Sequence, residues 1–455
     1  MNKLCIYNVI SLLQMQFRTL LKINHRIYDL KVFKVCSKSF SSNMDDTLKK
    51  TFEYCVKSVQ PNILMKKIIR REGSNICIDG NKFKLTKNVY IVGFGKAVIG
   101  MVRPLEDLLT IDNDSHLVQG IISVPFGIQD VLRDKQNYFP VENSRVDIFE
   151  GAFNNIPDLP AYETAKQIVE LAQERTENEL LFVLISGGGS ALFPIPCSPL
   201  SLDDKKEIIN KLSRAGATIN ELNAVRKAIS NSKGGNLAKA TKATVVSLIL
   251  SDVINSPLDI IGSGPTVPNL DTIEYVENIL RKYDISITEK LQCVFEKQRH
   301  KKVDCDFSHV KNVIIGSNET ALSSAAEFIN EKTDFIPIIV SSSLKGEAKE
   351  IGKSFADLSG IIIEQINRKE SNHLSDNIAS LFCITEDNHV NMVMNIQKAI
   401  VAQKNIILIF GGETTVTVKG DGTGGRNQEM VLAFTIAIKK VFFILPRHLE
   451  ASEPK

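Results

Sequence analysis

The sequence predicts an α/β protein of two lobes, in which helices cover a mainly parallel sheet. Two observations predict this fold class. Short runs of aliphatic and β-branched residues alternate along the chain with amphipathic stretches of helical length. Buried strands separated by such helices are typical of a parallel sheet that is covered on both faces. The 455 residues, of which 43% are hydrophobic, are enough for two packed domains.

The first lobe spans residues 44–270 and opens with a helix over residues 45–70, where apolar residues recur at helical spacing. Strands and helices then alternate. The expected strands are residues 88–92, 119–124, 180–185 and 244–250, and the expected helices are residues 97–109, 161–174 and 203–217. This order predicts a Rossmann-like arrangement of three layers, αβα.

The second lobe, residues 271–455, is a smaller α/β unit. Its expected strands are residues 313–317, 336–341 and 406–410, and its expected helices are residues 319–330, 345–358 and 389–402. The polar stretch 368–377 predicts a loop. Because glycine-rich turns follow strands in both lobes, we expect the turns to face one another across a cleft.

The first 43 residues differ in composition from the rest of the chain. They contain seven basic side chains and one acid, Asp29, among Leu, Ile and Phe. This composition is typical of a mitochondrial transit peptide, and a secretory signal or an untranslated extension before Met44 are the alternatives. We expect a mitochondrial protein if the leader is used and a cytoplasmic one otherwise. The chain carries +3 and the leader +6, so the remainder carries −3, which gives no indication of a nucleic-acid partner.

Composition also argues against two classes of site. No stretch reaches the roughly 18 consecutive apolar residues of a membrane span, so we expect no membrane partner. The eight cysteines include no C-x-x-C pair, and the seven histidines show no H-x-x-x-H spacing. We therefore expect reduced thiols and neither a zinc site nor a histidine base.

Glycine-rich turns follow several of the apolar runs. They are residues 93–96 (Gly-Phe-Gly-Lys), 186–190 (Ser-Gly-Gly-Gly-Ser), 262–266 (Gly-Ser-Gly-Pro-Thr) and 411–414 (Gly-Gly-Glu-Thr). Glycine lets backbone N–H groups converge on an oxyanion without interference from a Cβ atom, and a following helix N-terminus adds partial positive charge. The set of turns predicts an anionic, phosphate-bearing ligand.

The first two turns do not match the common phosphate or nucleophile motifs. Val98 stands where a dinucleotide fingerprint has its third glycine, and the P-loop's second glycine with Lys-Ser/Thr is absent. Lys96 is either a phosphate ligand or a solvated lysine at a helix start. Residues 186–190 form either an anion nest or a flexible turn, and they lack the G-x-S-x-G pattern of a hydrolase elbow.

Charged residues accompany the later turns. Arg226, Lys227 and Lys233 surround a helix end and either complement its dipole or bind a phosphate or carboxylate. Asp252, just beyond the most apolar strand, either holds Mg²⁺ or caps a turn. Arg426 lies among glycines, and we predict it for a bidentate grip on a carboxylate or a transferring phosphate.

Glu413 and Glu429 allow the same two roles as Asp252. Both lie in the glycine-rich stretches of the second lobe.

Taken in order, these segments resemble the MOFRL-type glycerate kinases. The matching stretches are collinear and run from about residue 45 to about residue 437. They are residues 93–97, 150–152, 157–158, 184–191, 226–227, 233–235, 250–252, 263–266, 341–347, 411–418 and 424–429. The resemblance implies ATP-dependent phosphorylation of D-glycerate to phosphoglycerate, in serine and fructose catabolism, in a cleft between two domains.

The resemblance also implies roles for individual residues. Lys96 and Arg426 are the expected catalytic residues, and Asp252 is the expected ligand of Mg²⁺. The expected contacts of ATP are Ser186, Gly187, Gly188, Gly189, Ser190, Lys233, Gly234 and Gly264. The expected contacts of D-glycerate are Gly95, Arg226, Glu413 and Asn427, with its carboxylate between the two catalytic residues. Phosphoryl transfer needs chiefly positioning and charge neutralisation, so a strong base is not required.

Members of this family continue past the point where this chain ends, so we expect an incomplete second lobe. A helix beginning near Gln428 should then expose an apolar face. Its residues are Val431, Leu432, Phe434, Ile436, Val441, Phe442 and Ile444. The alternative function is a non-catalytic nucleotide- or hydroxy-acid-binding variant, while nicotinamide-dependent reduction is disfavoured by the first turn. The sequence permits a homodimer and transfer to either the 2- or the 3-hydroxyl group.

Overall fold

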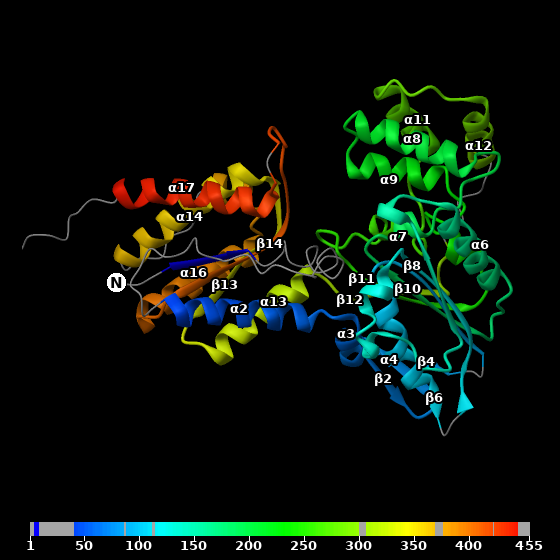
Figure 1. Cartoon of the computed structure of the whole chain (residues 1–455), viewed down its shortest axis with the longest axis horizontal. Helices are drawn as coiled ribbons and strands as arrows, with labels where there is room; N and C mark the ends of the chain where they lie inside the picture. The colour runs from blue at the N-terminus through cyan, green and yellow to red at the C-terminus, as the bar shows by residue number, and fades with distance from the viewer. Residues whose placement is uncertain are drawn as a thin grey trace, which may run out of the picture. The chain divides into compact units, whose positions relative to one another are not determined.

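The computed structural model describes residues 4–8, 41–85, 88–111, 114–299, 306–368, 376–421 and 423–444. These residues form two compact units (Figure 1). Unit 1 contains the described residues of 4–8, 41–58 and 318–444, and unit 2 contains those of 59–317. Most of the predicted transit peptide, residues 1–43, lies outside the described residues.

Unit 2 is built on a six-stranded sheet in which every neighbouring pair of strands is parallel. The strand order is β12-β11-β10-β5-β8-β9. The strands are β5 (Val89–Phe94), β8 (Leu117–Pro125), β9 (Val146–Gly151), β10 (Leu180–Ser186), β11 (Thr244–Leu250) and β12 (Val310–Gly316). The predicted mainly parallel sheet is confirmed. Its carboxyl ends all lie at one edge, where parallel sheets bind their ligands.

The units divide after Ser317, whereas the sequence placed the boundary at 270/271. β12 is the reason, because it pairs with β11 in the sheet of unit 2. Before β12, helices α11 (Ile273–Lys282) and α12 (Glu289–Arg299) share a separate core with α8 (Leu202–Arg214) and α9 (Ile219–Ala228). Figure 1 shows the four helices together.

Helices from several parts of the chain pack against the sheet. α6 (Leu159–Gln173) contacts β8 and β9, and its alanines and Ile168 belong to the core cluster that also contains Val92 and Val183. α3 contacts β12, where a Cβ atom on Gly316 would lie 3.2 Å from Leu64 Cδ2. The helices of unit 2 are α3 (Pro61–Ile68), α4 (Ile99–Leu109), α5 (Ile128–Leu132), α6, α7 (Gly189–Leu192), α8 (Leu202–Arg214), α9 (Ile219–Ala228), α10 (Asn236–Lys239), α11 and α12.

The stretch predicted as one helix over residues 45–70 is divided. α2 (Ser41–Ser58) ends before Pro61, which starts α3, and the chain turns extended at Ile69. Proline lacks the N–H that a continuous helix needs but is well accommodated in a first turn. The sequence also missed two small antiparallel sheets. These contain β2 (Ile69–Glu72), β3 (Asn75–Ile78) and β4 (Asn81–Lys84), and β6 (Thr110–Ile111) and β7 (Asp114–Ser115).

Unit 1 has a parallel sheet of order β1-β14-β13, with an aromatic core of Phe355, Phe382 and Phe410. Its strands are β1 (Leu4–Asn8), β13 (Ile336–Glu347) and β14 (Ile406–Thr415). Its helices are α2, α13 (Asn318–Lys332), α14 (Ala348–Arg368), α15 (Asp376–Leu381), α16 (Glu386–Ala402) and α17 (Arg426–Ile444). α14 and α17 lie side by side, and a Cβ atom on Gly352 would be 2.9 Å from Ala433 Cβ.

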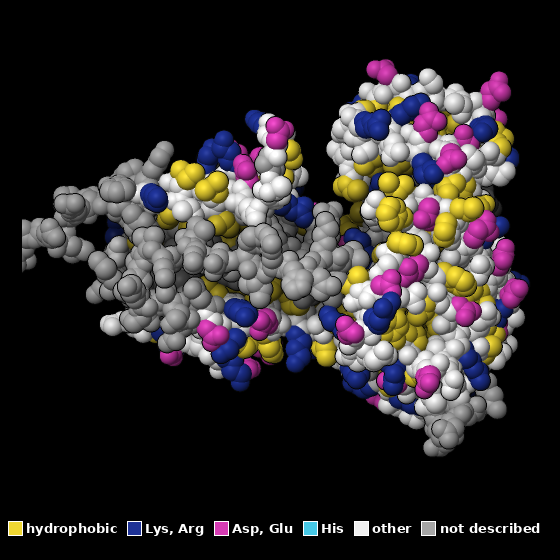
Figure 2. Space-filling model, in the orientation of Figure 1, with side chains coloured by type: hydrophobic (Ala, Val, Ile, Leu, Met, Phe, Trp, Pro, Cys, Tyr) yellow, Lys and Arg dark blue, Asp and Glu magenta, His cyan; other side chains and the backbone are white. Residues whose placement is uncertain are grey.

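The predicted apolar face of α17 is exposed in part. Val431, Leu432 and Ile436 are 40%, 59% and 58% exposed, and Figure 2 shows hydrophobic side chains on the surface over α17. Phe434 differs from the prediction because it packs partly against the core of unit 1. The side chains of residues 441, 442 and 444 lie outside the described part of the chain.

Two further expectations concern thiols and membranes. Among the described residues the cysteines form no disulfide. Of the helices in the described ranges, none combines the length and the apolar character that crossing a membrane would need.

Candidate active site

The turn after β5 and the turn after β10 are hydrogen-bonded to each other. The Lys96 amide donates to the Gly187 carbonyl over 2.9 Å, and the Ala97 amide donates to Ser186 Oγ over 2.9 Å. Gly95 has a φ of 142°, and a Cβ atom there would lie 2.7 Å from the Ser186 carbonyl oxygen. Glycine is therefore required at position 95 by both conformation and space.

We call residues 186–190 the nest, and two of its glycines face opposite charges. A Cβ atom on Gly188 would lie 3.0 Å from Lys96 Cε. A Cβ atom on Gly187 would overlap the Asp252 carboxylate, with Oδ1 2.7 Å away. The structure thus brings the lysine of the first turn and the acid beyond β11 to the same backbone, as expected from the ends of neighbouring parallel strands.

The helix that begins within the nest is a single turn. α7 contains four residues, Gly189–Leu192, and begins after Gly188, whose φ is 84°. Because the helix dipole is a sum over aligned peptide groups, a single turn contributes little positive charge. The positive charge at this site must therefore come chiefly from side chains.

Four cationic side chains on or near these loops lack a carboxylate partner among the described residues. Lys96, Lys205, Arg226 and Lys233 form no ion pair with any residue that the structure describes. Lys227 is different, because its Nζ lies 2.6 Å from Asp271 Oδ2 and 3.6 Å from Asp259 Oδ2. Desolvated cations without a counter-charge are unfavourable unless an anion compensates them. They favour an anionic ligand.

Three of these cations influence one another. Burial, with a smaller contribution from the charge of Arg226, lowers the pKa of Lys205 to about 7. Burial also lowers the pKa of Lys233 well below its usual range, with contributions from Lys205 and Arg226. The pKa of Arg226 is lowered by burial as well. The sequence missed Lys205, which is only 5% exposed and donates to Ser230 Oγ over 2.9 Å.

Lys233 supports the nest from within the protein. It is 1% exposed, and its Nζ donates to the carbonyl oxygens of Ser190 over 3.0 Å and of Gly262 over 3.3 Å. Ser190 Oγ lies 2.9 Å from Ser263 Oγ, which bonds to Asn223. The predicted contact of Lys233 with ATP stays a prediction, because its described bonds are to the backbone of two loops.

Gly234 and Gly264 join the same two loops. The Gly234 amide donates to the Ser263 carbonyl over 3.0 Å, and the Gly235 amide donates to the Gly264 carbonyl over 2.7 Å. Gly234 and Gly264 have φ values of 57° and 60°, which favour glycine. Their expected contacts with a nucleotide stay predictions.

The predicted contact of Arg226 with the substrate and the predicted binding of Mg²⁺ by Asp252 stay predictions. Arg226 Nη1 donates to Asn223 Oδ1 over 3.2 Å, so a substrate contact would use its other N–H groups. The local turn cap after β11 is Ser251, whose Oγ accepts from the Val253 amide over 3.2 Å. No group of three or more His, Cys, Asp or Glu side chains in the described ranges is placed to hold a metal ion. A metal at Asp252 would need ligands from phosphate or water.

The remaining predicted residues lie in unit 1. Arg426 Nη1, at the start of α17, is 2.6 Å from Glu413 Oε1 near the end of β14. Asn427 and Glu429 follow in the first turn of α17. This cluster and the nest belong to different units, each described by itself, so the predicted cleft stays a prediction.

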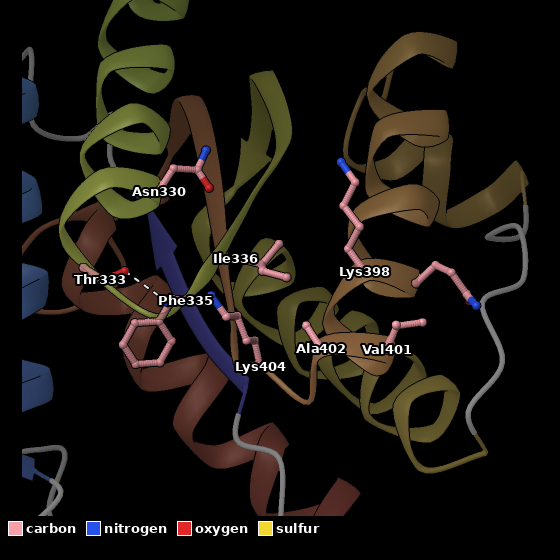
Figure 3. A pocket seen from close by; sticks show the side chains of 9 residues that line it. Asn330, Thr333, Phe335, Ile336, Lys398, Val401, Ala402 and Lys404 are labelled. Carbon is pink, nitrogen blue, oxygen red and sulfur yellow. Dashed lines mark hydrogen bonds between the residues drawn. The ribbon is translucent and has the colours of Figure 1, made fainter.

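A hollow of about 480 Å³ also lies in unit 1 (Figure 3). Ile336, which begins β13, and Lys404, which precedes β14, line it. It is therefore at the amino ends of these strands, opposite to Glu413. Parallel sheets bind ligands at their carboxyl ends, so we do not assign the active site to this hollow.

Comparison with known proteins extends these observations. Residues 47–296 match the family described as a domain of unknown function, DUF4147, and residues 406–446 match the MOFRL family. A glycerate kinase of Danio rerio is 37% identical over 409 residues, which are 86% of this chain and 80% of that protein. A glycerate 2-kinase of Pyrococcus horikoshii is 31% identical over 387 residues, covering 84% of this chain and 76% of that protein.

Solved structures agree with these matches. A crystal structure of a protein from Pyrococcus horikoshii has a TM-score of 0.66 at 30% identity, and it covers 87% of this chain and 80% of that chain. A glycerate kinase structure from Thermotoga maritima has a TM-score of 0.64 at 26% identity, with the same coverage. By sequence and fold, the chain belongs to the MOFRL-type glycerate kinase family.

Proposed function

We propose that this protein transfers a phosphoryl group from ATP to D-glycerate. The observation that carries the proposal is the contact between Lys96 and the nest. A lysine without a carboxylate partner among the described residues lies against a glycine-rich backbone, at the carboxyl edge of a parallel sheet. That combination suits a polyphosphate, and the relatives named above are glycerate kinases.

In the proposed reaction, the backbone of Gly187, Gly188 and Gly189 holds the phosphates of ATP. Lys96 neutralises the charge that develops on the transferring phosphoryl group. Preorganised positive charge at such a place is commonly the largest single contribution to catalysis of this kind. The buried charge of Arg226 strengthens the positive potential of the same loops.

Mg²⁺ fits this site through the nucleotide rather than through a cage of protein ligands. Asp252 would hold the ion together with phosphate oxygens, because its carboxylate borders Gly187. When bound, the ion neutralises negative charge on the phosphates. This assignment agrees with the lack of a preformed carboxylate cluster in the described part of the chain.

Arg426 of unit 1 is the proposed second catalytic residue. Its pairing with Glu413 fixes one edge of the guanidinium, so that the group is oriented before a ligand arrives. We propose that it binds the carboxylate of D-glycerate, with Asn427 as a neighbour of the substrate.

Phosphorus-31 NMR of a reaction mixture tests the proposal. Purified protein with ATP, Mg²⁺ and D-glycerate should form a phosphomonoester, whose coupling to carbon-bound protons distinguishes 2- from 3-phosphoglycerate. L-Glycerate and a sample without substrate are the controls. Binding of ATP without any phosphoglycerate would favour the non-catalytic alternative.

A further inference from the structure

The turn after β9 has an unusual backbone. Ala152, Asn154 and Asn155 have φ values of 53°, 53° and 62°, in the left-handed region that asparagine tolerates but alanine rarely adopts. Such conformations persist only where the surrounding structure holds them, and they concentrate at functional sites. The function proposed above does not use this turn, although its flanking residues belong to the motifs in the sequence.

Two carboxylates hold the turn in place. Asp158 accepts hydrogen bonds from the amides of Ala152 over 2.9 Å and Phe153 over 3.1 Å, while it also caps α6. Glu150, at the end of β9, accepts from the amides of Gly127 over 2.7 Å and Gln129 over 3.0 Å. The turn is therefore fixed both to α6 and to the segment after β8.

An aromatic contact fixes its other side. The rings of Phe153 and Phe126 are 5.4 Å apart and nearly perpendicular, at 80°. Edge-to-face pairs of this kind are favourable. The contact with Phe126 therefore holds Phe153 on one side of the turn.

Asn155 projects to the nest. A Cβ atom on Gly188 would lie 3.5 Å from Asn155 Oδ1 and 3.0 Å from Lys96 Cε, so both side chains border the same nest residue. In the sheet, β9 is separated from β10 by β8 and β5. The chain after β9 therefore reaches across two strands to bring this carboxamide to Gly188.

The carboxamide is available for a ligand. Within the described ranges, the Asn155 side chain forms no hydrogen bond, and the residue is exposed. A carboxamide offers two N–H donors and carries no charge, so it can bind a phosphate oxygen beside a lysine without competing for the lysine's charge. An oxygen held by the Gly188 backbone and Lys96 would lie within its reach.

We propose that Asn155 is a nucleotide-binding residue, whose side-chain N–H donates to a phosphate oxygen of ATP beside Lys96. The proposal rests on the function proposed above. In this proposal, the turn after β9 holds the side-chain N–H of Asn155 beside the nest.

Substitutions at Asn155 separate the side chain from the backbone. Asn155→Gly keeps the positive φ and removes the carboxamide. Asn155→Asp keeps the shape and also tolerates a positive φ, but it places a carboxylate beside the phosphate. Asn154→Gly is the matched control, because it changes the neighbouring residue of similar φ.

Isothermal titration calorimetry with ATP and Mg²⁺, without glycerate, measures the effect independently of turnover. We expect the Kd for ATP to rise about tenfold or more in Asn155→Gly, and further in Asn155→Asp, since one charge-assisted hydrogen bond is lost and then replaced by repulsion. Asn154→Gly should bind like the wild type. Thermal melting of each variant verifies that the fold is retained.

The outcomes distinguish the two proposals. Wild-type affinity for ATP in Asn155→Gly and Asn155→Asp would overturn the role of Asn155 and leave the kinase function standing. A wild-type protein that binds ATP through Asn155 but forms no phosphoglycerate would overturn the kinase function alone. A wild-type protein that does not bind ATP would overturn both.

Discussion

The carboxylate of Asp252 occupies the space beside Gly187 that a side chain would need. A Cβ atom on Gly187 would overlap Asp252 Cγ and lie 2.7 Å from Oδ1. Gly187 is not among the glycines of positive φ, so space rather than conformation requires glycine at this position. The nest and the acid beyond β11 are therefore fitted to each other.

Gly187→Ala should lower kcat/KM for glycerate phosphorylation by at least ~10²-fold, because it must displace Asp252 or the nest that contacts the transferring phosphate. Gly420→Ala is the control, since a Cβ atom there meets nothing within 4 Å. Steady-state kinetics of both variants measure the effect. Equal kinetics of Gly187→Ala and the wild type would show that this fit has no part in catalysis.

Lys96→Met should lower kcat by at least ~10²-fold, because it removes the charge that stabilises the transferring group while keeping most of the side-chain volume. Lys84→Met, at an exposed position of β4 in the same unit, controls for the loss of a positive charge. A kcat within a few fold of the wild type would refute the assigned role of Lys96.

Arg426→Ala should also lower kcat/KM by at least ~10²-fold. Arg426→Lys should recover little of this activity, because lysine keeps the charge but lacks the planar fork for a carboxylate. Titration with D-glycerate tests the assignment further, since weaker substrate binding should accompany the loss. If Arg426→Lys has full activity, the site requires only a positive charge, and the assignment of bidentate carboxylate binding to Arg426 is wrong.

Lys205 should make stability depend on pH. Its pKa in the folded protein is about 7, lowered from 10.5 by burial, so between these values the unfolded state binds more protons than the folded state. The stability of the wild type should therefore rise with pH from about 7 to about 10, relative to Lys205→Met.

Thermal melting at about pH 6.5 and about pH 9 measures this difference. We expect the melting temperature of Lys205→Met, relative to the wild type, to fall by a few degrees, on the order of 2–4 °C or more, between the two pH values. A difference that does not change with pH would show that Lys205 is not held in a desolvated environment. Lys84→Met should show no such dependence.

The strands β5, β8, β10 and β11 could be predicted because they are apolar runs, whereas β9 was missed because it mixes charged and apolar residues. Residues 180–186 and 244–250 are both strands close to the predicted positions. The small sheet of β2, β3 and β4 could not be predicted in the same way, because residues 69–84 mix charged and apolar residues without a clear period. β12 was assigned to the wrong side of the boundary because local sequence does not state which sheet a strand joins.

Some residues of the candidate site could likewise be predicted from the sequence, and others could not. Lys96, the nest and Asp252 follow strands, and a parallel sheet brings such positions together. Lys205 could not be recognised, because it stands in a run of charged residues that resembles an exposed helix start, and only packing shows that it is buried. Asn155 lies in a turn after an edge strand, and nothing in the sequence indicates that this turn reaches the nest.

A coupled ADP-release assay on the purified chain measures the proposed kinase activity itself. With ATP and Mg²⁺, the account predicts ADP release that depends on D-glycerate, that is much weaker with L-glycerate, and that is lost in Lys96→Met. A folded protein that binds ATP and releases no ADP above the substrate-free rate with D-glycerate would contradict the account.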